Sequence, residues 1–465
     1  MAKITFFGAA RQVTGSCYLI ETEDHRLLLE CGMRQGEDEQ EHKAGSGETF
    51  PPFDPHSIDA VILSHAHLDH TGMTPLLVRK GYRGPIYMTA TTCQLLPIMH
   101  RDSAFLLMRD VEWMNKRRQR AGKPPLEPPY TLQDVERELA LCEGLRYGEK
   151  RTILPGVALR YRDAGHILGS GIVELWFDGR KLVFSGDLGN SHSPLLEDPE
   201  AIEKADILLM ESTYGDRNHR SHEETMREFR EALDQAVDEG GNVLIPAFAV
   251  GRTQDILYHL GEMFQEGRLK QNQVFLDSPM GTSVSEVYEK NLHLFNEDNP
   301  RFRKKMTHTW EQWLPVLRFT RETEESMALN RIESGAIIIA GSGMCTGGRI
   351  RHHLKHNLWK RKTHVLIVGY QAFGTLGRKL VDGARHVRIL GQEIAVNAKI
   401  HTLGGFSAHA GQDQLLSWAR HFHKPHPRLF LVHGEPESMQ VLQKRLADDL
   451  HWEAVMPEEG ESFGI

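Results

Sequence analysis

One seven-residue stretch limits the folds and sites that this chain can build. Residues 64–70 read SHAHLDH and directly follow the apolar run 61–63. The apolar run predicts a buried strand, so the polar stretch predicts a turn at the end of that strand. His65 and His67 are two residues apart, which on an extended backbone directs both side chains the same way. The turn then carries Asp69 and His70 to a neighbouring position.

These four side chains suggest more than one metal ion. Imidazole and carboxylate groups are common zinc ligands, and a hydrolytic zinc ion uses three protein ligands and one water. Four ligands in one turn are too many for one open site and too few for two, so the stretch predicts two ions and further ligands elsewhere. The chain has 26 histidines, so chance clustering of ordinary hydrogen-bonded histidines is the alternative. The H-x-H-x-D-H order directly after a strand favours metal binding.

Three other predicted strands end near a metal-binding residue that is followed by glycine. They supply His166 in DAGHILGSG, Asp187 in VFSGDLGN and His433 in LFLVHGEPE. Each is a weak signal when taken alone. Their order along the chain is a stronger argument, and we expect these three to complete the site.

The pattern of strands and helices changes twice along the chain. Short strands fill the first half, whereas residues 221–370 alternate between helices and apolar strands, which is typical of an α/β layer with a largely parallel sheet. From about Ala398 the first pattern returns. We therefore predict one split domain at 1–212 and 394–465, with a second domain inserted at 213–393. Residues 101–150, which contain NKRRQR and PPLEPP, are predicted to be a surface insertion in the first domain.

Composition excludes several classes of protein. The chain has 465 residues, 40% of them hydrophobic, which favours several packed domains and argues against disorder. It has no signal-peptide pattern and no apolar stretch long enough to cross a membrane. The five cysteines are scattered without a C-x-x-C pair, so we expect a reducing cytoplasm and neither a disulfide framework nor a thiolate zinc site. The net charge of −8 leaves nucleic-acid binding to local basic clusters.

The motif set as a whole resembles the metallo-β-lactamase superfamily, in its β-CASP branch. The metal motifs carry the first resemblance, and MESTYGDRNH, IPAFAVGRTQDILY, DSPMGTSVSEVYEKN, GSGMCTGGRI, FSAHAG and LVHGEPE carry the second. The chain is most similar to the short cleavage-and-polyadenylation-factor-like ribonucleases of bacteria and archaea, because the C-terminal domain of ribonuclease J is not found after His433. The resemblance implies an α/β fold, an αββα sandwich with an inserted β-CASP domain.

The resemblance also implies a dinuclear centre and a substrate. One metal would be held by His65, His67 and His166, the other by Asp69, His70 and His433, with Asp187 bridging them. Two zinc ions are expected, with manganese left open by ligand type. They would activate a hydroxide for attack on phosphodiester bonds of single-stranded RNA, with cleavage inside the chain, from the 5′ end, or both.

Further residues are implied by the same resemblance. His409 of FSAH would protonate the leaving oxygen, oriented by Glu211, and Asp69 would act in catalysis as well as metal binding. Ser407 would contact the substrate. The glycine-rich turn AGSGMCTGG can aim backbone N–H groups at a phosphate, so Ser342 and Gly343 are expected near RNA, although a simple tight turn is the alternative.

Basic segments are the other candidate RNA contacts. Residues 349–362 begin with Arg349 and contain no acidic residue, and they directly follow the glycine-rich turn. A basic run is usually only a solvated face, but this position favours contact with nucleic acid. The runs at 301–305 and 115–120 are less well placed.

Two positions depart from the family pattern. Glu30 stands where relatives usually have an aspartate that braces the metal ligands, and Phe373 stands where an acidic residue is expected. The brace at Glu30 keeps its carboxylate but gains one methylene, which changes its reach.

Three functions remain open from the sequence. The favoured one is a metal-dependent ribonuclease, with RNA in a groove between the two domains. The oligomeric state is left open by the sequence, with a homodimer as one candidate. The second is a hydrolase of the same fold that acts on DNA or on a thioester or lactam. The third is an inactive RNA-binding relative, which the complete ligand set argues against.

Overall fold

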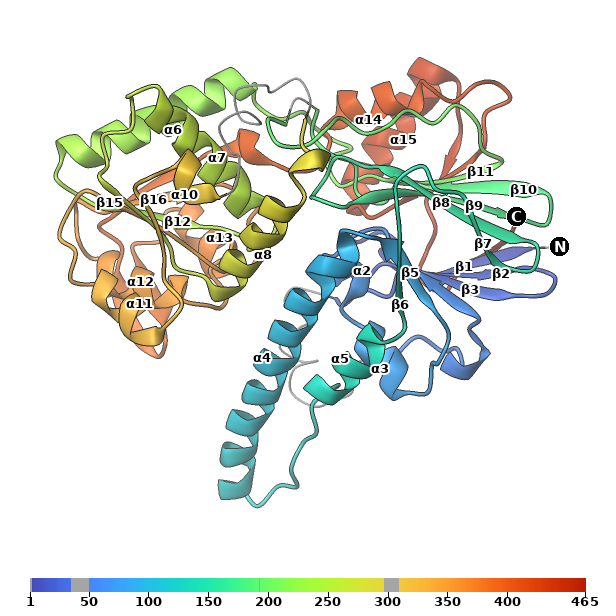
Figure 1. Ribbon diagram of the computed structural model, residues 1–465, viewed down its shortest axis with the longest axis horizontal. Helices are drawn as coiled ribbons and strands as arrows, with labels where there is room; N and C mark the ends of the chain where they lie inside the picture. The colour runs from blue at the N-terminus through green and yellow to red at the C-terminus, as the bar shows by residue number, and fades with distance from the viewer. Residues whose placement is uncertain (1, 35–49, 192, 297–308) are drawn as a thin grey trace. The chain divides into compact units, whose positions relative to one another are not determined.

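The computed structural model describes residues 2–34, 50–191, 193–296 and 309–465, which form two compact units (Figure 1). The first unit comprises Met1–Ser193, Asp198–Asn218 and His409–Ile465, and the second comprises Pro194–Glu197 and His219–Ala408. The predicted limit between residues 393 and 394 lies inside the second unit, because β19 (Lys399–Thr402) pairs with β16 (His364–Ile367) of that unit's sheet. The basic run predicted at 301–305 lies outside the described residues.

Two mixed sheets form the centre of the first unit. In order across the first sheet, the strands are β22 (Ser462–Gly464), β1 (Lys3–Gly8), β2 (Cys17–Glu21), β3 (Arg26–Leu29), β4 (Ala60–Ile62), β5 (Ile86–Thr89) and β6 (Cys142–Leu145). In order across the second, they are β21 (Ala454–Val455), β20 (Arg428–Val432), β11 (Ile207–Glu211), β10 (Arg180–Phe184), β9 (Gly171–Phe177), β8 (Val157–Asp163) and β7 (Arg151–Leu154).

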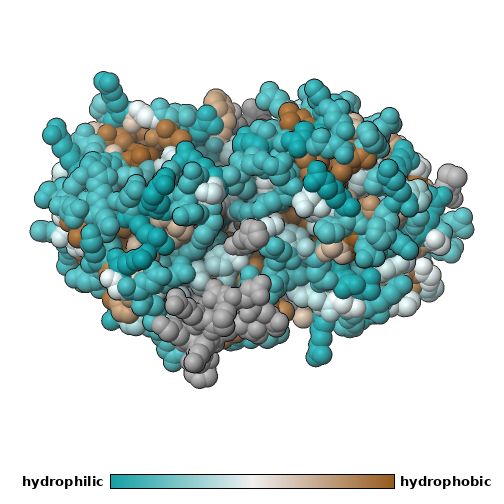
Figure 2. Space-filling view, turned by 90° about the horizontal axis from the view of Figure 1, so that it is seen from above, coloured by the Kyte–Doolittle hydropathy of each residue, from teal (hydrophilic) through white to brown (hydrophobic). Residues whose placement is uncertain are grey.

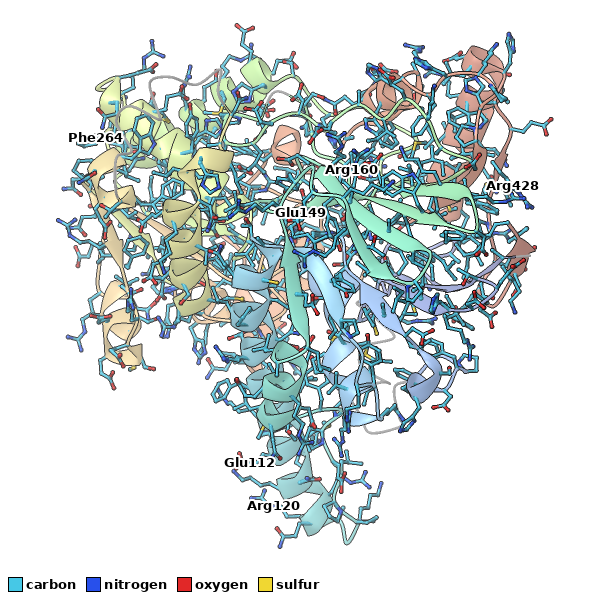
Figure 3. All side chains as sticks on the ribbon, turned by 45° about the vertical axis from the view of Figure 1, so that its right-hand side comes forward. Glu112, Arg120, Glu149, Arg160, Phe264 and Arg428 are labelled. Atoms are coloured by element: carbon cyan, nitrogen blue, oxygen red, sulfur yellow. The ribbon has the colours of Figure 1, made fainter. Side chains whose placement is uncertain are left out.

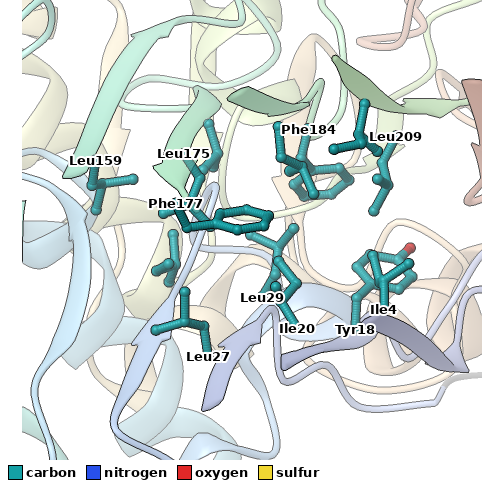
Figure 4. Close-up of a cluster of buried hydrophobic side chains, with 14 of the residues drawn as sticks. Ile4, Tyr18, Ile20, Leu27, Leu29, Leu159, Leu175, Phe177, Phe184 and Leu209 are labelled. Atoms are coloured by element: carbon teal, nitrogen blue, oxygen red, sulfur yellow. The ribbon is translucent and has the colours of Figure 1, made fainter. Parts of the chain in front are cut away.

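The two sheets pack face to face around an apolar core. Alternate residues of β1, β2 and β3, such as Ile4, Tyr18 and Leu29, face residues of the second sheet such as Phe177 and Phe184 (Figure 4). All five side chains are buried. Burial of alternate residues follows from the two-residue repeat of a strand, and it leaves the other face of each sheet for helices.

Helices cover the outer face of each sheet. Leu77, Leu96 and Val135 belong to the core on the outer side of the first sheet, and Leu416 and Leu442 belong to the core on the outer side of the second. The predicted αββα sandwich is therefore confirmed. The helical segments of this unit are η1 (Pro55–Ser57), α2 (Leu68–Thr71), α3 (Thr74–Arg79), α4 (Thr92–Arg120), α5 (Leu132–Leu139), α14 (Gln412–Ala419) and α15 (Pro436–Leu450).

The second unit is an α/β layer with a parallel sheet, as predicted. Across the sheet, the strands are β14 (Leu317–Phe319), β13 (Gln273–Leu276), β15 (Ala336–Ala340), β12 (Val243–Pro246), β16 and β19, and every adjacent pair is parallel. A separate hairpin joins β17 (His386–Ile389) and β18 (Gln392–Ala395). The helical segments are α6 (His222–Asp238), α7 (Arg252–Gln265), α8 (Pro279–Lys290), η2 (Leu292–Leu294), α10 (Trp310–Trp313), α11 (Thr323–Leu329), α12 (Ile350–Asn357), α13 (Leu376–Val381) and η3 (Gly404–Phe406).

The segment predicted as a surface insertion is partly built into the first unit. Helix α4 begins at Thr92, before the predicted insertion, and Ser103 and Ala104 are buried on its inner face. At the other end of the segment, β6 pairs with β5 as the edge strand of the first sheet. Within this segment, the outer part of α4 and the residues that return to α5 project from the unit (Figure 1).

The face in Figure 2 is mostly hydrophilic, and hydrophobic residues occur on it in small groups. Among the described helices, none combines the length and the apolar character that crossing a membrane requires.

Candidate metal centre

Four strands of the second sheet end at or near predicted site residues, all on the same side of the sheet. Strands β10, β11 and β20 are parallel, and β8 runs in the same direction because β9 is antiparallel to both β8 and β10. Their carboxyl ends therefore lie together. His166, Asp187 and His433 follow β8, β10 and β20, and Glu211 is the last residue of β11.

The SHAHLDH stretch supplies the ligands from the first sheet. After β4 the backbone bends at Ser64 and Ala66 and then reaches His67, an extended residue that is the N-terminal cap of α2; the helix carries Asp69 and His70. The first two histidines lie together, with His65 Nε2 3.1 Å from His67 Nδ1. Both His65 and His70 are fully buried.

The predicted ligands gather in two neighbouring groups. One contains His65, His67, His166 and Asp187, the other contains Asp69, His70 and His433, and within each group the ligand atoms lie within 4.8 Å of one another.

Asp187 lies between the two groups. Its Oδ2 atom is 3.5 Å from the Nε2 atoms of both His65 and His166, and 3.4 Å from Nε2 of His70. Its Oδ1 atom is 3.6 Å from Nδ1 of His433. One carboxylate is therefore within reach of imidazoles from both groups, as a bridging ligand requires.

The chemistry of this set of side chains fits bound cations. Asp187 Oδ1 is buried and has no hydrogen-bond partner among the described residues, and His70 Nε2 faces His433 Nε2 at 3.2 Å. Burial and the neighbouring His70 hold the pKa of His65 well below its usual value, and burial lowers that of His67 to about 4, so both are neutral and able to ligate. Burial alone would raise the pKa of Asp187, but the imidazoles of His433 and His70 hold it well below the usual value.

Glu30 braces the ligand turn. Its carboxylate accepts hydrogen bonds from the Ser64 backbone N–H at 2.6 Å, from Ser64 Oγ at 3.0 Å and from His70 Nδ1 at 2.5 Å. The His70 contact leaves Nε2 as the nitrogen that faces the ligand group. Burial raises the pKa of Glu30, and these hydrogen bonds oppose the rise. The residue predicted as a brace thus contacts both the start and the end of the ligand turn.

His409 and Glu211 form a pair beside the ligand groups. His409 Nδ1 lies 3.4 Å from Glu211 Oε1 and 3.9 Å from Asp187 Oδ2. Glu211 Oε1 also accepts a hydrogen bond from the Leu188 N–H at 2.6 Å. Burial alone would lower the pKa of His409, but the carboxylates of Glu211 and Asp187 raise it to about 9. At neutral pH this imidazole is therefore protonated and can donate a proton.

The predicted substrate contacts Ser342, Gly343, Arg349 and Ser407 lie in the second unit. Ser342 Oγ accepts hydrogen bonds from the N–H groups of Thr346 and Gly347, so this hydroxyl stabilises its own turn. Gly343 packs against Phe248, because a Cβ atom added there would lie 2.6 Å from the ring. Ser407 follows η3.

Arg349 is held by the protein. Its guanidinium donates to Asp277 Oδ1 at 2.7 Å and to the carbonyl oxygens of Thr320 and Arg321. This network occupies the side chain that was expected to contact RNA. Further along this segment, Arg361 and Lys362 are exposed, and Arg351 and Lys360 are half-buried.

Sequence analysis missed a buried network behind the ligand turn. Thr71 Oγ1 lies 2.9 Å from His100 Nε2, and His100 Nδ1 lies 2.9 Å from Glu138 Oε2. Thr74 Oγ1 also donates to Glu138. The network ties α2 to α4 and α5. One signal was present, since Glu138 is an acidic residue on the buried side of α5 next to Val135.

Three family descriptions match the sequence. "Metallo-beta-lactamase superfamily" matches residues 10–247, "Beta-Casp domain" matches residues 253–380, and "Zn-dependent metallo-hydrolase RNA specificity domain" matches residues 393–457. A metal cofactor is therefore part of what the chain shares with these families.

Three relatives match nearly the whole chain. Ribonuclease TTHA0252 of Thermus thermophilus is 43% identical over 447 residues, which cover 96% of each chain. The RNase J-like protein of Methanocaldococcus jannaschii is 31% identical over 94% of this chain and 93% of its own length. Transcription termination factor FttA of the same organism is 33% identical over 93% of this chain, which spans 67% of FttA.

A solved structure is similar in fold. The crystal structure of a protein of unknown function from Enterococcus faecalis aligns over 99% of both chains with a TM-score of 0.57 and 13% identity. The ligand groups at the sheet edge, the inserted parallel sheet and these matches lead to one assignment. The chain belongs to the β-CASP branch of the metallo-β-lactamase superfamily.

Proposed function

We propose that this chain is a metal-dependent ribonuclease that hydrolyses phosphodiester bonds in single-stranded RNA. One observation carries the proposal: Asp187 lies within 3.6 Å of imidazoles from two ligand groups, and His409 lies 3.9 Å from the same carboxylate. This arrangement combines a dinuclear site with a proton donor, which is what phosphodiester hydrolysis needs.

The ligand groups suit two zinc ions. His65, His67 and His166 would hold one ion, Asp69, His70 and His433 the other, and Asp187 would contact both. Imidazole ligands favour zinc, and manganese is the alternative. When bound, such a pair supplies Lewis acidity towards a phosphoryl oxygen and lowers the pKa of a bound water.

The other side chains orient groups and move a proton. His409, with its pKa raised to about 9, carries a proton at neutral pH and would donate it to the leaving oxygen. Glu211 holds His409 through Nδ1, which leaves Nε2 to face the substrate. Glu30 fixes His70 in the same way.

RNA is the substrate that the comparisons favour. The matched description at residues 393–457 names RNA specificity, and two relatives are named as ribonucleases or RNase J-like. Exposed basic residues such as Arg361 and Lys362 supply charge for a phosphate backbone. We expect cleavage inside the chain, from the 5′ end, or both.

The test is a substrate comparison with metal-loaded protein. End-labelled single-stranded RNA, DNA of the same sequence, a thioester and a lactam would be compared, and product lengths followed over time. We expect RNA to be cut fastest and His409→Asn to slow cutting strongly, while His421→Asn, at an exposed position, leaves the rate unchanged. Faster cutting of DNA or thioester, or equal rates for wild type and Asp69→Ala, would overturn the proposal.

Two smaller expectations belong with this proposal. A cytoplasmic location agrees with the five cysteines being free of disulfides. A homodimer, one candidate from the sequence, stays a prediction, and sedimentation velocity tests it directly.

A further inference from the structure

The outer half of α4 carries an exposed stripe of aromatic and basic side chains. Phe105, Arg109, Trp113, Lys116 and Arg120 follow one another at spacings of three or four residues, so they lie on one face of the helix. Arg117 adjoins this face. Phe105 is 49% exposed and Trp113 is 59% exposed, although both are large hydrophobic residues. We call these six residues the α4 stripe.

The stripe is locally basic in a chain of negative net charge. Between Phe105 and Arg120 only two residues are acidic, and one of them, Glu112, is paired with Lys116 at 2.7 Å. No carboxylate of the described residues forms an ion pair with Arg109, Arg117 or Arg120. Two of these cations instead lie over aromatic rings, Arg109 over Phe105 at 5.5 Å and Arg117 over Trp113 at 4.8 Å.

Packing does not explain these residues. The opposite face of the helix is buried at Val111, and Asn115 exchanges two hydrogen bonds with the backbone of Leu126. Arg118 donates to the Pro124 carbonyl oxygen. These contacts hold the outer half of α4 against the returning chain. The stripe is therefore presented on a fixed helix and is not needed to form it.

We propose that the α4 stripe is a second binding site for single-stranded RNA, separate from the metal centre. Basic groups neutralise phosphates, and exposed aromatic rings stack on bases of any sequence. A helix that binds a lipid surface segregates a continuous apolar face from its charges, whereas here the aromatic and basic residues share one face. The choice of RNA as the polyanion rests on the proposed function.

The position of α4 sets the length of RNA that can use both sites. Its first turn lies beside a ligand loop, because Thr92 Oγ1 donates to the carbonyl oxygen of Gly169, three residues after His166. From there the helix extends to Arg120 at its far end (Figure 3). At a rise of 1.5 Å per residue, the stripe lies about 20 to 42 Å from Thr92 along the helix. At about 3.4 Å per nucleotide, the stacked spacing of one strand in a duplex, this corresponds to roughly 6 to 12 nucleotides. A stretched single strand would cover the same distance with about half as many.

The experiment compares charge-matched variants on RNAs of two lengths. Arg109→Gln/Arg117→Gln/Arg120→Gln removes three charges from the stripe, and Arg180→Gln/Lys204→Gln/Lys444→Gln removes three from exposed positions elsewhere in the first unit. All proteins carry Asp69→Ala so that RNA stays intact. Binding is measured by anisotropy with RNAs of about 3 and about 30 nucleotides, below and above the length that reaches the stripe from the ligand loop.

We expect the stripe variant to bind the long RNA at least tenfold more weakly and the short RNA unchanged. The salt dependence for the long RNA, as the slope of log K against log [salt], should fall by about 2, since each lost phosphate contact in single-stranded RNA contributes about 0.7. Trp113→Ala should weaken binding about 5- to 100-fold through lost stacking. The charge-matched control should behave as wild type.

Several results would overturn the inference. One is equal weakening by the stripe variant and the control, and another is equal weakening for short and long RNA. Binding of wild type to anionic vesicles in preference to RNA, lost in the stripe variant, would assign the stripe to a membrane. Self-association lost in the stripe variant would assign it to a second copy of the chain.

The outcome separates from that of the proposed function. If wild type cuts no RNA but the stripe variant still loses affinity for long RNA, the proposed function fails and this inference stands. If wild type cuts RNA but both triple variants bind alike, the inference fails and the proposed function stands.

Discussion

Asp187 and Asp277 are buried aspartates, one in each compact unit, and their hydrogen-bond partners differ. In the second unit, Asp277 Oδ1 accepts hydrogen bonds from Thr320 and Arg349, and Oδ2 accepts from Ser326 and His353, all at 2.6 to 2.7 Å. In the first unit, Asp187 faces imidazole nitrogens at 3.4 to 3.6 Å, and Oδ1 has no hydrogen-bond partner in the described part of the chain.

The difference separates a structural carboxylate from a ligand. A buried carboxylate is stable when protein donors satisfy it, and Asp277 has four such donors. Imidazole nitrogens around an unsatisfied carboxylate oxygen at slightly longer distances instead leave a place for a cation. Both clusters combine Asp and His, so residue type alone does not distinguish a metal site from a folding network.

Removing the charge of Asp187 should have the largest effect on catalysis. Asp187→Asn should lose bound metal and reduce RNA cleavage by more than about a thousandfold, since changes to residues that only orient the ligands already cost about 10- to 100-fold. Metal content by mass spectrometry and single-turnover cleavage measure the two effects. Two metal equivalents retained in this variant would contradict the role of Asp187 as a shared ligand.

The matching change at Asp277 should affect folding instead. Asp277→Asn leaves Arg349 with a weaker partner, and loss of one member of a buried ion pair costs about 3 to 5 kcal/mol. Urea denaturation followed by tryptophan fluorescence should show this loss for a transition of the second unit, while metal content stays at the wild-type level. A variant that loses metal without losing stability would remove the distinction between the two aspartates.

The fold could be predicted where apolar strands end in polar residues. The sandwich, the parallel inserted sheet and the capped helix that begins after Ser221 all follow from local patterns. The length of α4 was not predicted, although Ala104, Leu107, Val111 and Met114 repeat at helical spacing along its outer half. The sequence places the return to the first unit at residue 394, before the point where the structure has it. The strand at Lys399–Thr402 still belongs to the parallel sheet of the second unit, and the other strands of that sheet are distant in sequence.

The residue types of the candidate site could be predicted from the sequence, but the side chains that each of them contacts could not. Asp187 and Asp277 both follow an apolar strand, and nothing local tells them apart. What distinguishes them is which side chains arrive from distant parts of the chain, such as Arg349 and His353 at Asp277. The same reason explains why the ion pair between Arg349 and Asp277 and the link from His100 to Glu138 were missed.

Glu30 extends the comparison within the first unit. It lies beside the metal ligands, but like Asp277 its carboxylate is satisfied by protein donors, from Ser64 and His70. Glu30→Gln should therefore weaken metal binding by about 10- to 100-fold without abolishing it. Glu30→Asp keeps the charge with a shorter reach and should fall between wild type and Glu30→Gln. Competition with a chelator measures the metal affinities, and Glu453→Gln, at an exposed position, is the control. A complete loss of metal from Glu30→Gln would mean that Glu30 is itself a ligand.

The smallest expected effect is a pH dependence that belongs to Asp277 alone. Burial alone would raise the pKa of Asp277, but hydrogen bonds from His353, Ser326, Thr320 and Arg349 outweigh burial and lower it to about 2. Because the folded pKa lies below the unfolded value of about 3.9, this stabilisation is fully present above about pH 4 and is lost as the pH falls towards about 2.

We expect Asp277 to contribute about 2 kcal/mol in this way. The measurement is urea unfolding of wild type and Asp277→Asn at several pH values, both without metal. Metal is removed first because acid would release it from the ligand groups and so change the stability of both proteins. The stability difference between the two proteins should shrink by that amount between about pH 5 and about pH 2. A difference that stays constant over this range would mean that the four donors do not favour the charged carboxylate, and Asp277 would then no longer serve as the satisfied counterpart of Asp187.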